Sequence, residues 1–257
     1  MDISWREFIS LAQRIKFLLK AFLVTYTTLI ALLIFLTGNL VYIILQAPSS
    51  DKLTEITVNS VGLDDMPAHV SAAFLAAEDI RFHDRPGMET RAIIKSLVRA
   101  ALQKNDIPQE ITLVQKLVKY AFEDDKDTFA RNLQEAYLAF YLQNTHNRKQ
   151  ILQMYVNHTS FGQNLYGISN ASYHYFGKRP QDVTIGEAAL LAAIAKSPQG
   201  FSRTMDLKNA SAARNKILSD MQKGGLLGNK AYLTAQKENL ILNQSLDQPA
   251  KAYEVNY

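Results

Sequence analysis

Two adjacent carboxylates, Glu78 and Asp79, stand at the predicted end of a helix, and their types suggest proton-transfer chemistry. The helix is predicted to open near Pro67, because proline is favoured at the first helical position. A carboxylate at the C-terminal end of a helix faces the negative end of the helix dipole, which costs some tenths to about 1 kcal/mol when it is exposed. A carboxylate held at such a place can act as a general base. The same pattern also fits a solvated acidic helix end with Arg81 as its partner.

A second acidic candidate, Glu135, lies in a helix predicted near 128–143 that is apolar nearly all round. Such helices are usually buried, and charged residues are rarely buried unpaired. Arg131 precedes it by one helical turn, so the two side chains can form an ion pair. The local pattern therefore leaves a structural pair and a site residue both open. Glu187 instead occupies the third helical position of a capping box that starts at Thr184, and we interpret it as structural.

These sites are preceded by an uncharged, apolar run over residues 21–45. About 20 apolar residues are enough to span a bilayer. Basic residues dominate before the run, so the positive-inside rule places residues 1–20 in the cytoplasm and the remainder outside. A cleaved signal peptide is the alternative, although its apolar stretch would be only about 7–15 residues long. We predict a single-pass transmembrane helix over 21–45, a linker over 46–65 and one domain over 66–257.

Composition excludes several classes of protein. The chain has 257 residues, a net charge of +4 and no cysteine, which excludes disulfide scaffolds, thiolate zinc sites and cysteine nucleophiles. Its basic residues are not clustered, so nucleic acid is not an expected partner. The five histidines show no paired metal-binding spacing. The Ser49–Lys52 match to the S-x-x-K motif of acyl-serine enzymes stands without a K-T-G motif, and we interpret it as chance.

The domain is predicted to be all-α or α-dominated. Helical spacing of apolar residues and capping signals predict a series of helices beyond the first. They lie near 93–102, 110–122, 128–143, 147–156, 166–175, 184–196, 207–223 and 229–238. A short strand is predicted at 56–58.

Several blocks of the sequence together resemble family 51 glycosyltransferases, the peptidoglycan transglycosylases found in class A penicillin-binding proteins and as monofunctional enzymes. The run ILQMYVNHTSFGQNLYGISNASYHYFGK over 151–178 is similar to a family block nearly throughout. EDIRF over 78–82, the helix with Arg131 and Glu135, and EAALLAAIAKSPQGF over 187–201 resemble others. The resemblance covers about 66–222. It implies a lysozyme-like domain with a membrane-touching subdomain, in the monofunctional, membrane-anchored form.

The resemblance implies that the protein polymerises lipid II into glycan strands and releases polyprenyl diphosphate. Glu78 would be the general base, and Glu135 would hold the donor directly or through a divalent ion such as Mg²⁺ or Mn²⁺. Lys119 and Arg131 would supply cations for the diphosphate. Further substrate-binding side chains would be Asp79, Arg81, Thr112, Gln115 and Asn157. The implied partners are lipid II, nascent glycan strands and other cell-wall synthases, at the outer face of the bacterial cytoplasmic (inner) membrane.

One block departs from the family pattern G-G-S-T-x-T-Q-Q-L-x-K-N and reads QEITLVQKLVKY over 109–120. The matching positions are Thr112, Gln115, Leu117 and Lys119. Both glycines are replaced, and Lys116 stands where the family has glutamine, as a residue expected to be solvated. The departures leave open a catalytically weakened relative that binds glycan strands or synthase partners as a scaffold. A lytic enzyme that cleaves glycan is a third possibility.

Overall fold

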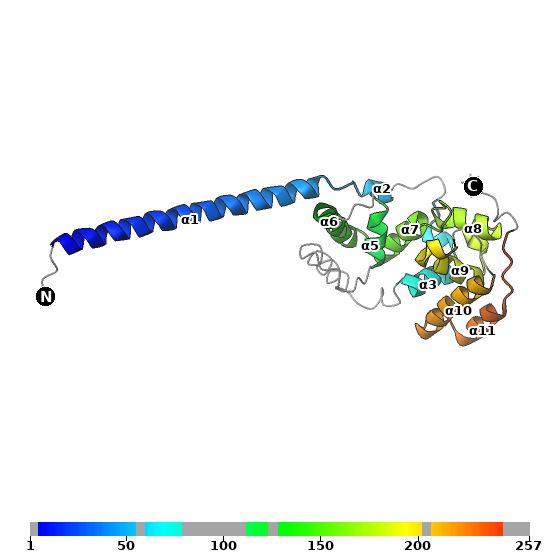
Figure 1. Ribbon diagram of the computed structural model, residues 1–257. Helices are drawn as coiled ribbons and strands as arrows, with labels where there is room; N and C mark the ends of the chain where they lie inside the picture. The colour runs from blue at the N-terminus through cyan, green and yellow to red at the C-terminus, as the bar shows by residue number, and fades with distance from the viewer. Residues whose placement is uncertain (1–4, 55–59, 79–111, 123–127, 202–206, 244–257) are drawn as a thin grey trace. The chain divides into compact units, whose positions relative to one another are not determined.

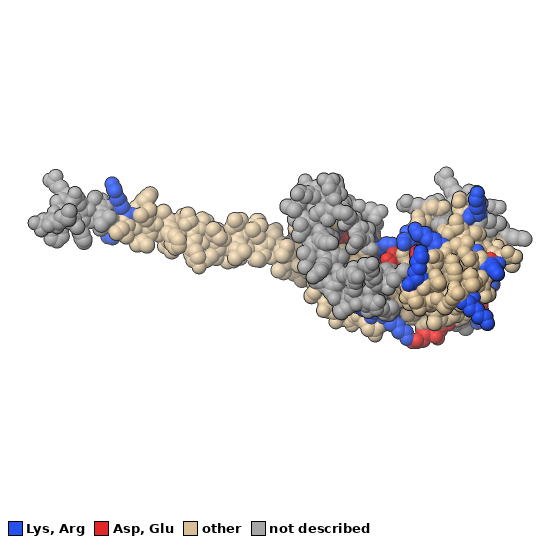
Figure 2. Space-filling view, turned by 90° about the horizontal axis from the view of Figure 1, so that it is seen from below, with Lys and Arg blue, Asp and Glu red and all other residues tan. Residues whose placement is uncertain are grey.

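The computed structural model describes residues 5–54, 60–78, 112–122, 128–201 and 207–243, and the chain forms two compact units, 1–47 and 48–257. The first unit is the long helix α1, Trp5–Leu45 (Figure 1). Its part from Arg14 to Leu45 is long and apolar enough to cross a membrane, and its most apolar stretch is not buried against protein. In Figure 2 this helix is tan along most of its length, with basic side chains only near its N-terminal end.

The second unit is built from helices. Its described elements are α2 (Asp51–Thr54), η1 (Leu63–Asp65), α3 (Ala68–Glu78), α5 (Leu113–Lys119), α6 (Phe129–Thr145), α7 (Arg148–His158), α8 (Ile168–Phe176), η2 (Pro180–Asp182), α9 (Ile185–Lys196), η3 (Pro198–Phe201), α10 (Leu207–Lys223) and α11 (Asn229–Lys237). Within the described ranges, extended pairing is limited to an isolated antiparallel bridge between Ser160 and Tyr166. The α-dominated class is confirmed.

Local capping decides where several helices begin. Thr112, Asn147 and Thr184 each form a capping box at the start of α5, α7 and α9, and Thr128 caps α6 through its side chain. The helix predicted near 110–122 is shorter than expected, because the capping box fixes its first residue at Leu113. The predicted strand at 56–58 and the predicted helix near 93–102 lie outside the described residues.

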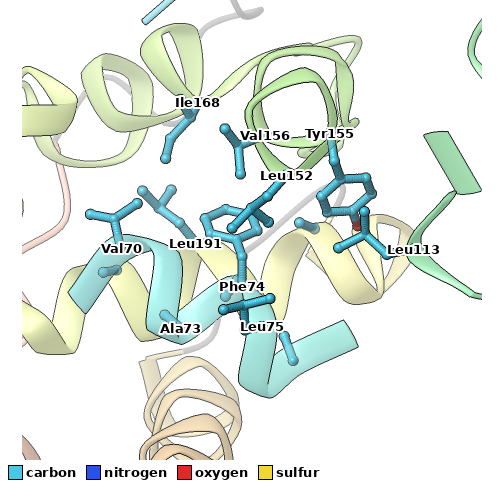
Figure 3. Close-up of a cluster of buried hydrophobic side chains, with 14 of the residues drawn as sticks. Val70, Ala73, Phe74, Leu75, Leu113, Leu152, Tyr155, Val156, Ile168 and Leu191 are labelled. Atoms are coloured by element: carbon cyan, nitrogen blue, oxygen red, sulfur yellow. The ribbon is translucent and has the colours of Figure 1, made fainter. Parts of the chain in front are cut away.

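The core of the domain surrounds α9, in which every residue from Gly186 to Ala195 is buried. α3 and α10 both pack against α9, and α8 contacts it as well. Figure 3 shows the ring of Phe74, from α3, among aliphatic side chains from α7, α8 and α9. The Phe74 ring also makes edge-on contacts with the rings of Tyr155 and Phe161, at centroid distances of 6.4 and 6.1 Å. This packing fixes the position of α3 along its length.

A second helical group, α5, α6 and α7, forms the side of the domain on which the candidate residues lie. α5 packs against both α6 and α7, as Figure 1 also shows. Tyr120, which follows α5, ties it to the end of α7: its hydroxyl lies 3.1 Å from Thr159 Oγ1 and accepts a hydrogen bond from the Ser160 amide at 3.2 Å. α5 is therefore held between the helices that carry Glu135 and Tyr155.

Candidate active site

Glu78 is the last residue of α3, and its carboxylate is enclosed by side chains from two other helices. The side chain is only 2% exposed. Oε1 accepts a hydrogen bond of 2.8 Å from the hydroxyl of Tyr155, on α7. Oε2 forms an ion pair with the ammonium of Lys116, on α5. Three helices thus converge on one buried carboxylate.

Tyr155 reaches Glu78 because its own helix buries one face. Ile151, Leu152, Tyr155 and Val156 are all buried, as their helical spacing requires. A buried tyrosine hydroxyl needs a hydrogen-bond partner, which Glu78 provides. Burial, and next the nearby charge of Glu78, raise the pKa of Tyr155 well above its ordinary value. The phenol therefore remains protonated and donates to the carboxylate.

One further cation lies at the end of α3, and another lies on α5. Lys196, at the end of α9, donates from Nζ to the backbone carbonyl of Ala77 at 2.6 Å. Lys119 is exposed and lies in the last turn of α5 together with Lys116. Figure 2 shows basic side chains at several places on the face of the domain that it presents, with acidic side chains beside some of them.

Glu135 and Arg131 form the i,i+4 pair on α6 that the sequence allowed. Arg131 Nε donates to Glu135 Oε1 at 2.8 Å, and the two side chains are 10% and 19% exposed. The Arg131 guanidinium also lies over the ring of Phe122, with Cζ 3.4 Å from the ring centroid. The ion pair leaves part of the Glu135 side chain accessible. Glu135 can therefore pair with Arg131 and still contact a donor substrate.

The other predicted binding residues have structural contacts of their own. Thr112 and Gln115 bond to each other's backbone in the capping box of α5. The Asn157 amide spans two segments: Oδ1 accepts from the Val61 amide, and Nδ2 donates to the carbonyls of Val61 and Gln153. Their contact with substrate remains a prediction. Asp79 and Arg81 lie outside the described residues.

A glycine allows the chain after α7 to approach Asn157 closely. Gly167 has a φ of +82°, and a Cβ placed there would lie 2.8 Å from the backbone oxygen of Asn157. A larger residue at this position would be strained and would clash with the backbone of α7. The glycine of the 151–178 block is thus explained by packing.

A metal ion held by protein ligands alone does not fit the described residues. They contain no group of three or more His, Cys, Asp or Glu side chains arranged to hold a metal ion. The accessible carboxylate of Glu135 already accepts from Arg131. A divalent cation here would need oxygen ligands from a bound diphosphate.

Sequence reasoning missed two members of the Glu78 cluster. Lys116 was expected to be solvated, and this expectation is wrong: its ammonium pairs with Glu78 and its side chain is only 29% exposed. Tyr155 was not singled out. Its place on the apolar face of α7 was the available signal, because a buried hydroxyl implies a partner.

Comparison with known proteins gives consistent matches. A family model described as "Transglycosylase" matches residues 48–222. Penicillin-binding protein 1F of Bacillus subtilis is 33% identical over 183 residues, which cover 71% of this chain and 26% of the relative. Penicillin-binding protein 1A of Haemophilus influenzae is 33% identical over 181 residues, 70% of this chain and 21% of the relative. The chain thus spans about a quarter of the length of these curated relatives. A crystal structure of the Haemophilus influenzae protein covers 54% of this chain and 17% of its own, at 24% identity and a TM-score of 0.36.

Proposed function

The chain belongs to the transglycosylase family, and from this premise we propose that it is a peptidoglycan glycosyltransferase. Its substrate would be lipid II, which it would polymerise into glycan strands with release of polyprenyl diphosphate. The observation that carries this proposal is the Glu78 carboxylate, buried at the end of α3 and held by Tyr155 and Lys116. This is a fixed carboxylate of the kind that proton abstraction requires.

In the proposed reaction, the 4-hydroxyl of the acceptor sugar attacks the anomeric carbon of the donor. The new glycosidic bond forms as the bond to the diphosphate oxygen breaks, and the hydroxyl proton passes to Glu78. Tyr155 positions the carboxylate through its 2.8 Å hydrogen bond to Oε1. A positioned general base contributes roughly 10²–10⁴-fold to the rate.

The leaving diphosphate carries growing negative charge, and basic side chains are proposed to neutralise it. Lys119 is exposed on α5, and Arg131 lies on the adjacent α6. Preorganised positive charge in a partly dry site is usually the larger catalytic contribution. Glu135 would hold Mg²⁺ or Mn²⁺ if such an ion binds together with the diphosphate, and the ion would supply additional charge neutralisation. The roles proposed for Glu78, Tyr155, Lys119 and Arg131 do not depend on that ion.

The long helix α1 supports a membrane location for this activity. Its length and apolar composition suit a bilayer span, and a lipid-linked substrate stays in the membrane. We propose a single-pass protein of the inner membrane, with its N-terminus in the cytoplasm and its catalytic domain outside. A reporter that works only in the cytoplasm, fused at Tyr257, should be silent. Strong reporter activity would contradict this orientation.

A second candidate function is a weakened relative that binds glycan strands or synthase partners. The observation that favours it is Lys116, which occupies one oxygen of the proposed base and replaces the glutamine of the family pattern. In this alternative, substrate would bind but the base would remain blocked.

Purified full-length protein in detergent, incubated with lipid II, separates these functions. We expect polymeric glycan, detected by gel electrophoresis of labelled substrate. Binding of lipid II without polymer would support the scaffold. Degradation of finished sacculi without polymer would support a lytic enzyme.

A further inference from the structure

Both oxygens of the proposed base already have donors, and this arrangement conflicts with its task. Glu78 Oε1 accepts from Tyr155, Oε2 pairs with Lys116, and the side chain is 2% exposed. A general base must come within hydrogen-bond reach of the proton that it removes. A carboxylate can accept more than two hydrogen bonds, so the obstacle is its enclosure. A neighbouring side chain must therefore move before an acceptor hydroxyl can approach it.

The two donors differ in their freedom to move. Tyr155 is fully buried, and its ring packs edge-on against Phe74. Lys116 has a side chain that is 29% exposed, and its ammonium ends a flexible four-carbon stem. Displacing Lys116 requires only side-chain rotation toward solvent, whereas displacing Tyr155 would open the core. Lys116 is thus the movable partner.

The direction of that movement follows from the charges beside it. Lys119, in the same last turn of α5, is exposed, and α5 packs against the helix that carries Arg131. A diphosphate bound at these cations would present more negative charge to Lys116 than the single carboxylate of Glu78 does. An ammonium carries three donors on a rotatable stem and binds phosphate as a point charge.

We propose that Lys116 is a displaceable cover on Glu78, drawn from Oε2 to the diphosphate when the donor binds. Lys116 is then a positioning residue that exposes the base only when the leaving group is in place. The identity of the anion rests on the proposed function. The glutamine of the family pattern could not act in this way, because it carries no charge for the diphosphate to attract.

Chemical labelling of Glu78 tests the cover without requiring turnover. Full-length protein in detergent is treated with a water-soluble carbodiimide and an amine nucleophile, and modification of Glu78 is read by peptide mass spectrometry. The probe is inorganic pyrophosphate, with sodium chloride at equal ionic strength as the control for screening. Wild-type labelling should be slow in salt and rise about ten- to a hundredfold with pyrophosphate, the effect of one charge-assisted hydrogen bond.

Three variants sharpen the test. Lys116→Gln should label rapidly with or without pyrophosphate, and Lys116→Arg, which keeps the charge, should retain the pyrophosphate response. Lys149→Gln is the matched control, because Lys149 forms an exposed ion pair with Asp64 away from Glu78, and it should behave as wild type. In turnover, Lys116→Gln should raise KM and also lower kcat, because the ammonium would no longer neutralise charge on the leaving diphosphate.

Labelling of wild type that ignores pyrophosphate, or Lys116→Gln that labels as slowly as wild type, overturns the cover. These outcomes are separate from failure of the proposed function. If the protein makes no glycan but pyrophosphate still increases labelling of Glu78, the cover is supported and the proposed enzyme activity is contradicted. If the protein makes glycan but pyrophosphate does not change labelling, the enzyme activity is supported and the cover is contradicted.

Discussion

Two buried carboxylates in this protein, Glu78 and Glu187, each pair with a partly exposed lysine, yet they are built differently. Glu187 lies in the first turn of α9, with a side chain 6% exposed. Its Oε1 accepts from Lys178 Nζ at 2.7 Å, and its Oε2 accepts from the Thr184 amide at 2.8 Å. Glu78 is 2% exposed at the opposite end of its helix and takes both hydrogen bonds from side chains of other helices.

The difference shows which carboxylate serves the fold. Glu187 satisfies one backbone donor, the Thr184 amide, at a helix N-terminus, where the helix dipole also favours its charge. The dipole opposes the charge of Glu78 at the C-terminal end of α3. Glu78 instead pairs with Lys116 and Tyr155, which are side chains of other helices. We infer that Glu187 contributes to stability and Glu78 to chemistry.

Among variants at positions other than Glu78, Lys119→Ala should have the largest effect on activity. Lys119→Ala removes an exposed charge from the last turn of α5, so its loss should leave the fold intact. A charge-assisted hydrogen bond to the diphosphate contributes about 1.5–3 kcal/mol, so kcat/KM should fall roughly ten- to a hundredfold. Steady-state kinetics and thermal melting check this, with Lys149→Gln as a control. Unchanged kinetics would show that Lys119 does not bind the diphosphate.

Glu187→Ala should lower stability and leave activity unchanged, whereas Lys119→Ala should do the opposite. It leaves the Thr184 amide and Lys178 without their carboxylate, which should lower the free energy of unfolding by about 1–3 kcal/mol. Below the melting transition, turnover should match wild type. Denaturant unfolding and polymerisation assays on the same preparation measure both quantities. A loss of activity at full stability would remove the distinction between the two carboxylates.

Tyr155→Phe should have a smaller effect on the chemistry. It deletes the hydrogen bond to Glu78 Oε1 and keeps the packing of the ring against Phe74. A net hydrogen bond contributes about 0.5–1.5 kcal/mol, so kcat should fall about two- to tenfold while KM changes little. Kinetics at saturating substrate would reveal it. An equal change in KM and none in kcat would mean that Tyr155 acts on binding instead.

The smallest expected effect concerns stability far from Glu78, at His174 in α8. Burial lowers the pKa of His174 below its ordinary value of 6.5. As pH falls below about 6.5, the unfolded chain binds the proton first, so stability declines; above that pH both states are neutral and no effect remains. The loss should stay near or below about 1 kcal/mol at pH 6. His174→Gln should reduce the fall in Tm between pH 7 and 6, and an unchanged fall would assign it to other groups.

Local features of the fold could be predicted from the sequence because their causes are local. The capping box of Thr184 and Glu187 lies within four residues, and the structure confirms it. The helix expected near 128–143 is present as α6, Phe129–Thr145, with Thr128 as its N-cap. The i,i+4 pair of Arg131 and Glu135 is likewise a property of one helix.

The environment of Glu78 could not be predicted, because its partners are distant in the chain. Lys116 and Tyr155 lie 38 and 77 residues away from it. Which residues of α5 and α7 meet the end of α3 depends on how the helices pack against one another, as Tyr155 does against Phe74, and no local pattern encodes that. For this reason Lys116 was wrongly expected to be solvated. The family resemblance selected Glu78 but gave no indication of the lysine that covers it.

If Glu78 is the base and Glu187 is structural, the same substitution at the two positions should have very different effects on the rate. Glu78→Gln and Glu187→Gln make the same isosteric change in two lysine-paired carboxylates. Both proteins are assayed for lipid II polymerisation beside wild type, after thermal melting has shown each to be folded. Glu78→Gln should lose roughly 10²–10⁴-fold in rate, as expected for removal of a general base. Glu187→Gln should stay near wild type, because glutamine also completes a capping box. Polymerisation by Glu78→Gln at the wild-type rate would contradict the account.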